Sequence, residues 1–140
     1  MRSITFIFLL ILGLGCSGPK NTTAKHNQLN GTWIPFKQEM GGKALPKEYI
    51  EIQKLIIDDS NYTVTAESVD KGIVRYNGDK MDIYGKEGIN KGKHFTAIYK
   101  YENEELTICY NLAGNSYPEV FDTKGKPLFF LSVFKKQTLK

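Results

Sequence analysis

The sequence predicts an all-β fold, an antiparallel meander of about eight short strands with one short helix after the first strand. Short runs rich in β-branched and aromatic residues are separated throughout by turn residues. Asn77-Gly78 stands between two such runs, and this dipeptide is the strongest short-range hairpin signal. The sequence has no long helical period and no alternation of strands with helices. Such a meander is built either as a barrel or as a sandwich.

The expected strands follow one another closely along the chain. They cover residues 32–40, 54–58, 61–67, 72–76, 80–85, 94–101, 105–111, 117–122 and 127–136. The helix is expected just after Pro46, because proline is favoured in the first turn, where its missing N–H is not needed. Asp59-Ser60 and residues 102–104 are expected to be tight turns between neighbouring strands.

Alternation within these runs favours the barrel. Apolar residues recur at every second position, as in Tyr62 and Val64, or Met81 and Ile83, and polar residues such as Asp82 point the other way. Closing the sheet would remove its exposed edges. Inward residues of a small barrel either fill its core or line a cavity for one ligand.

The N-terminus has the features of a secretory signal. Arg2 provides a positive charge, residues 4–12 are apolar apart from one threonine, and small residues lead to Cys16. A helix that spans a membrane needs about 20 apolar residues, so this run is too short. The stretch "LGLGC" resembles a bacterial lipobox, in which the cysteine receives the lipid. The alternative is an ordinary signal peptide that contains a cysteine by chance.

The chain is therefore expected to have three parts. Residues 1–15 form a lipoprotein signal peptide, residues 16–28 a flexible tether that begins at the lipidated Cys16, and residues 29–140 the β-barrel domain. The predicted location is the cell envelope, anchored to a membrane by lipid. Because no acidic residue follows Cys16, the outer membrane is expected if the organism is Gram-negative.

Composition narrows the class of protein. The chain is 41% hydrophobic and 24% charged, which is typical of a globular domain. The net charge is +4, but no basic run or stripe is present, so no nucleic-acid partner is expected. With Cys16 lipidated, only Cys109 remains, in the run "LTICYNL". It is expected to be a buried structural thiol.

The order of motifs resembles a family of small bacterial lipocalin-like domains, first catalogued from planctomycete genomes and mostly uncharacterised. The motifs are "LNGTW" at residues 29–33, "GGKALP" at 41–46, and above all the block at 90–110 that contains "NKGK", "AIY" and "ICY". The resemblance covers Leu29 to about Lys136. The family usually has an arginine where this chain has Tyr117, so no role of that arginine is transferred. The resemblance implies a barrel of about eight antiparallel strands and no named enzyme activity.

Candidate barrel-lining residues follow from the alternation and from this resemblance. They are Trp33, Tyr62, Val64, Ile83, Tyr99, Ile108 and Tyr110. Simple core packing is the competing interpretation for each of them, since aromatic residues are favoured in strands. Trp33 is expected to close one end of the core, under Lys135 or Lys136 of the last strand.

No catalytic set is found in the sequence. His94 has no evident partner, and the chain has only two histidines, so neither a metal site nor a cofactor site is expected. The predicted function is a membrane-anchored lipoprotein whose barrel takes a small apolar or amphipathic ligand, and the protein is expected to be a monomer. The alternative is a non-enzymatic interaction or structural module with a filled barrel. An enzyme is the third hypothesis, and a cavity that holds His94 beside a carboxylate would favour it.

Overall fold

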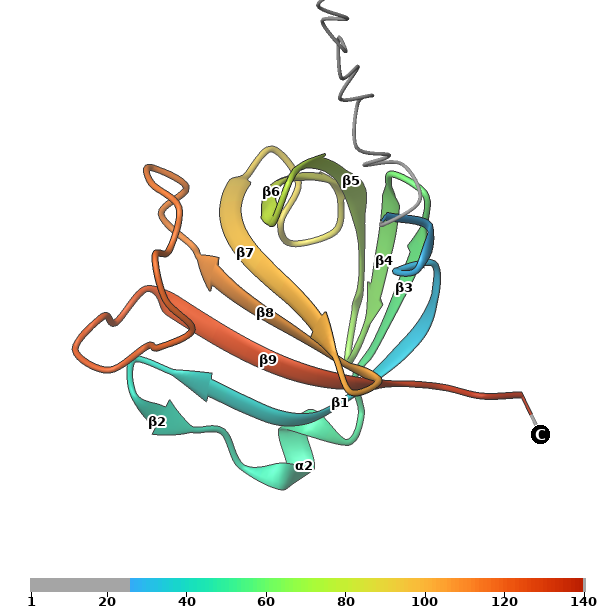
Figure 1. Ribbon diagram of the computed structural model, residues 1–140, viewed down its shortest axis with the longest axis horizontal. Coiled ribbons are helices and arrows are strands. Elements are labelled where there is room, and N and C mark those ends of the chain that lie inside the picture. The colour runs from blue at the N-terminus through green and yellow to red at the C-terminus, as the bar shows by residue number, and fades with distance from the viewer. Residues whose placement is uncertain (1–25, 140) are drawn as a thin grey trace, which may run out of the picture.

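The computed structural model describes residues 26–139. The predictions for the signal peptide, for Cys16 and for most of the tether lie outside these residues. Nine strands and one short helix are described (Figure 1). Their bounds are β1 Gly31–Met40, β2 Lys43–Ala44, α2 Lys47–Ile50, β3 Lys54–Asp58, β4 Asn61–Thr65, β5 Val69–Asn77, β6 Lys80–Glu87, β7 His94–Glu102, β8 Glu105–Asn111 and β9 Phe129–Lys136.

The strands form one closed antiparallel sheet. From β3 to β9 each strand pairs with its neighbours in the chain, and β1 pairs with both β3 and β9. The two-residue β2 pairs only with the end of β1. Eight strands therefore make the barrel, which confirms the predicted all-β barrel with a short helix after the first strand and excludes the sandwich. Within residues 26–139, no helix combines the length and apolar character needed to cross a membrane.

The two ends of the barrel differ in their connections. The turns at residues 59–60, 78–79 and 103–104 lie together at one end, which we call the tight-turn end (Figure 1 shows the β7–β8 turn). Gly78 has φ of +62° there, as the predicted Asn-Gly hairpin requires. The connections at residues 66–68, 88–93 and 112–128 lie at the opposite end, the loop end, together with α2.

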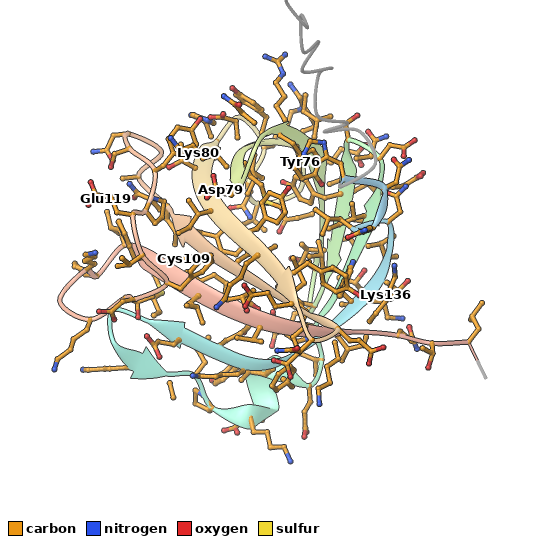
Figure 2. The ribbon with its side chains drawn as sticks, viewed as in Figure 1. Tyr76, Asp79, Lys80, Cys109, Glu119 and Lys136 are labelled. Atoms are coloured by element: carbon orange, nitrogen blue, oxygen red, sulfur yellow. The ribbon has the colours of Figure 1, made fainter. Side chains whose placement is uncertain are left out.

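Leu29 and Trp33 close the tight-turn end. Both side chains are fully buried, and Trp33 Nε1 donates a hydrogen bond to the Leu29 carbonyl oxygen at 2.7 Å. Lys136 Nζ lies 5.3 Å from the centroid of the indole, the cationic contact that the sequence predicted (Figure 2 labels Lys136 at the end of β9). The interior of the barrel is therefore sealed at this end.

The prediction of a strand at residues 117–122 is wrong, because the structure has no strand there. This segment belongs to the long connection between β8 and β9 (Figure 1). Its proline has no N–H to donate to a ladder. Its aromatic residues, Tyr117 and Phe121, instead pack on the outer face of the sheet, where Ile98 and Leu131 are buried.

Cys109 lies in this outer cluster and not in the barrel interior (Figure 2). Its side chain is fully buried and makes no disulfide, so the prediction of a buried structural thiol is confirmed. Burial raises the pKa of the Cys109 thiol, although the nearby Lys126 lowers it in part. Such a thiol is a poor nucleophile because little of it is thiolate at neutral pH.

Candidate ligand cavity

The barrel encloses a cavity of about 200 Å³. It is bounded by residues from β1, from every strand from β3 to β9, and from the loop end. The lining residues are Gln38, Gln53, Lys54, Leu55, Ile57, Tyr62, Val64, Asp70, Val74, Tyr76, Met81, Ile83, Asn90, Phe95, Ile108, Tyr110, Leu112, Phe130 and Phe134. The barrel is thus not completely filled by its own side chains.

Strand alternation explains the apolar wall. In β5, for example, the inward positions are Asp70, Gly72, Val74 and Tyr76, and the residues between them are more exposed. The same period places branched aliphatic and aromatic residues inward from β3 to β9. The result is a pocket lined mainly by apolar groups with a few polar ones, which is the usual character of a small-molecule site.

The structure brings most of the predicted lining residues together. Those at the cavity are Tyr62, Val64, Ile83, Ile108 and Tyr110. Trp33 and Tyr99 are buried but do not line it. Trp33 belongs to the sealed end, and the Tyr99 hydroxyl donates to the Gly78 carbonyl oxygen at 2.9 Å, in the turn of the β5–β6 hairpin. Both side chains therefore hold the tight-turn end together.

The opening of the cavity lies at the loop end. The lining residues there include Lys54, which is exposed, and Gln53 and Asn90, which are partly exposed. Gln38 and Gln53 join in a reciprocal amide pair: Gln38 Nε2 donates to Gln53 Oε1 at 2.7 Å, and Gln53 Nε2 donates to Gln38 Oε1 at 3.0 Å. Gln53 Nε2 also donates to the Tyr49 carbonyl oxygen at 2.8 Å. These bonds attach the segment around α2 to the rim.

Asp70 is the least exposed charged residue of the cavity lining and lies near the loop end, at the second residue of β5. It occupies an inward position of β5, with an exposed fraction of 8%. Asp70 Oδ1 accepts a hydrogen bond from the Asn90 backbone N–H at 3.1 Å. This bond holds the β6–β7 connection against the start of β5, so Asp70 has a structural role as well as a place in the wall.

Three tyrosine side chains, Tyr62, Tyr76 and Tyr110, also line the cavity. The Tyr76 hydroxyl is buried without a hydrogen-bond partner among the described residues. Burial, reinforced by the neighbouring Tyr99, raises the pKa of Tyr76 to about 12. Burial, reinforced by Tyr62 and Tyr76, also raises the pKa of Tyr110. At neutral pH these groups are uncharged hydroxyls.

His94 lies outside the cavity. Its Nε2 is 2.7 Å from Asp82 Oδ1, on the outer face of β6 and β7, and the Tyr117 hydroxyl donates to Asp82 Oδ2. The His94 ring stacks on Tyr84, with centroids 4.6 Å apart. These contacts fasten the β8–β9 connection to the barrel surface. An enzyme would be favoured by a cavity that holds His94 beside a carboxylate. His94 does lie beside the Asp82 carboxylate, but this pair is on the outer surface of the barrel and not in the cavity.

No group of three or more His, Cys, Asp or Glu side chains that could hold a metal ion is found in residues 26–139. Comparisons of the chain with protein-family models, with curated proteins and with solved structures found no match. A function for this chain is therefore inferred from its sequence, its barrel and the cavity within it.

Proposed function

We propose that this protein is a membrane-anchored envelope lipoprotein whose barrel binds a small, mainly apolar ligand. The observation that supports ligand binding is the cavity of about 200 Å³, enclosed by apolar side chains and open at the loop end. The proposed lipid anchor rests on the apolar run at residues 4–12 and on Cys16. The lipocalin-like resemblance of residues 29–136 is in keeping with a barrel that binds a ligand.

The volume of the cavity limits the size of the ligand. A dry cavity of about 150 Å³ is sufficient to bind benzene. A cavity of about 200 Å³ therefore suits a single ring, a small bicyclic molecule or a short alkyl chain. It is too small for a phospholipid with two long acyl chains. The proposed cargo is a small molecule and not a membrane lipid.

The alternative was a structural or interaction module with a filled barrel. An unfilled volume in a core costs stability, because its wall loses packing contacts. Here the volume lies between inward residues of β3 to β9 while the tight-turn end is well packed. This contrast between a sealed end and a hollow middle favours ligand binding over the alternative.

A cavity-filling variant tests ligand binding. Val74 is a buried lining residue of β5, and Ile73 is its neighbour on the outward face. Val74→Phe places a ring in the cavity, whereas Ile73→Phe adds the same ring type outside it. Binding of toluene and indole would be followed by two-dimensional NMR. We expect dissociation constants between about 1 μM and 1 mM for the parent protein and for Ile73→Phe.

Val74→Phe should weaken both probes at least tenfold while the protein stays folded. If neither probe shifts the resonances of residues around the cavity at millimolar concentration, the ligand-binding proposal is wrong. If Val74→Phe binds as well as Ile73→Phe, the probes occupy another place and the cavity is not the site.

The lipid anchor is tested separately. Mass spectrometry of the membrane fraction should find a mature chain that begins at an acylated Cys16. More than one acyl chain is needed for stable anchoring, so the modified residue should carry at least two. Cys16→Ser should release the protein from the membrane. An unmodified N-terminus in the membrane fraction would exclude the anchor and leave the ligand-binding proposal untouched.

A further inference from the structure

We propose that the cavity selects a small amphipathic ligand with a positively charged amine, which pairs with the carboxylate of Asp70. This inference rests on the proposed ligand-binding function and adds the chemical class of the ligand. It is supported by the inward position of Asp70, by its lack of a cationic partner among residues 26–139, and by the aromatic residues that line the same cavity.

The position of Asp70 in β5 makes its carboxylate part of the cavity wall. Val74 and Tyr76 alternate inward on the same strand and line the same cavity. The residue paired with Asp70 on β4 is Val64, which is another lining residue. A carboxylate therefore occupies a position of the wall where the neighbouring strand β4 places an apolar side chain.

Among residues 26–139, Asp70 has no partner of opposite charge. Aspartate is almost never this buried unless it is paired, because an ionised carboxylate loses its hydration. Its one protein hydrogen bond comes from the Asn90 backbone N–H. No lysine, arginine or histidine among residues 26–139 lies within 4.0 Å of it. Asp70 Oδ2 accepts no hydrogen bond from the described chain and is accessible, so a protonated amine can donate to it.

The rest of the wall suits a cation with an apolar body. Tyr62, Tyr76 and Tyr110, together with Phe95 and Phe130, line the cavity that Asp70 enters. The faces of aromatic rings attract a cation, most strongly where water is excluded. The same rings pack against an alkyl or aromatic body. A single molecule with an amine at one end would use both properties.

Lys54 is the one cation in the lining, and it could in principle favour an anionic ligand. Its side chain is exposed at the rim, where water screens it, whereas the Asp70 carboxylate is largely removed from water. An anionic group placed beside Asp70 would add a second negative charge at the same buried position. The buried charge therefore decides the selectivity, and the net charge of +4 acts only at long range.

Three probes of equal chain length test the proposal. Hexylamine is cationic at neutral pH, hexan-1-ol is neutral and hexanoate is anionic, and their six-carbon chain suits the cavity. Calorimetric titration of the parent protein should show hexylamine binding roughly ten- to a hundredfold more tightly than hexan-1-ol, the usual gain from a charged hydrogen bond. Hexanoate should bind most weakly.

Asp70→Asn removes the charge but keeps an oxygen that can accept from the Asn90 N–H. Asp58→Asn is the matched control, because Asp58 is exposed at the tight-turn end and its change alters the net charge equally. Asp70→Asn should weaken hexylamine about tenfold or more and leave hexan-1-ol within about twofold. Asp58→Asn should leave both affinities unchanged.

The outcomes separate this inference from the proposed function. Equal binding of hexylamine and hexan-1-ol to the parent protein, or tighter binding of hexanoate, would overturn the role of Asp70 but not ligand binding. An unchanged ratio of amine to alcohol in Asp70→Asn would do the same. Failure of all three probes to bind would instead count against the cavity as a binding site. The ratio in the parent protein tests the proposal even if the variant does not fold.

Discussion

Replacing Trp33 by phenylalanine tests how the tight-turn end is sealed. The smaller ring loses the indole N–H, which leaves the buried Leu29 carbonyl oxygen without its partner at a cost of about 1–3 kcal/mol. A void of roughly 40 Å³ adds about 1 kcal/mol, at about 24 cal/mol per Å³. Trp33→Phe should therefore lower the free energy of unfolding by about 2–4 kcal/mol, a large share of the about 5–15 kcal/mol typical of a domain.

Urea unfolding followed by circular dichroism measures this change, because Trp33 is the only tryptophan and its fluorescence is lost in the variant. The midpoint should fall while the slope with urea stays constant. Lys136→Met is the companion variant: it keeps an apolar stem over the indole and should cost only about 1 kcal/mol. A cost below 1 kcal/mol for Trp33→Phe would show that the indole hydrogen bond and its packing do not seal the barrel.

Three further variants probe other parts of the structure. Gly72→Ala places a methyl group 2.6 Å from Tyr62 Cε1 and against the backbone of β6, so it should cost about 1–3 kcal/mol in urea unfolding and displace Tyr62 from the cavity. Burial raises the pKa of Asp82, but the hydrogen bonds that it accepts from Tyr117 and His94 outweigh burial, so the pKa of Asp82 is lowered. The stability from that carboxylate is present above its unfolded pKa of 3.8 and is lost as the pH falls through the lower folded value. Tyr117→Phe should make thermal midpoints less sensitive to acid, and an unchanged acid profile would contradict this. Tyr76 has its pKa raised to about 12, so stability should fall from pH 10, where the unfolded chain ionises, to about pH 12. Tyr76→Phe should reduce that alkaline loss without lowering stability at pH 7, and an absorbance titration at high pH checks it.

Much of the barrel could be predicted from local pattern. Period-two alternation in β4 and β8 places Tyr62 and Ile108 inward, and the Asn-Gly turn marks the β5–β6 hairpin, because each of these signals acts over a few residues. Closure depends on the pairing of β1 with β9, which are far apart in sequence. Alternation favoured the barrel over the sandwich, but the pairing of β1 with β9 that closes it appears only in the tertiary structure.

The sequence pattern did not predict that Asp70 and Gln38 line the cavity, for two physical reasons. The strand predicted at residues 72–76, which is β5 of the structure, began at Gly72, so Asp70, two residues earlier on the same face, was not considered. Extending the alternation back through Gly72 would have found it. In β1, a bulge between Pro35 and Lys37 adds a residue, which turns Gln38 inward in place of Lys37. A proline inside a strand is the signal that could have indicated this bulge.

The segment at residues 117–122 shows a different limit. Its aromatic and β-branched residues resemble a strand, yet Tyr117 and Phe121 pack on the outside of the barrel in the cluster that contains Cys109. A surface connection that covers an apolar sheet face has the same local composition as an edge strand. Only the tertiary structure reveals that the outer face of β7 to β9 is apolar and needs a cover.

The closed and open ends of the barrel determine which way its opening faces when the protein is attached to a surface. His26 packs on Tyr76, and Lys136 ends the last strand at the tight-turn end, so both ends of the described chain leave the domain on the side away from the opening. A protein immobilised through its C-terminus on a sensor surface would present its opening to the sample. Attached to a support by either terminus, the barrel would turn the opening of its cavity toward the surrounding medium and away from the surface that holds it.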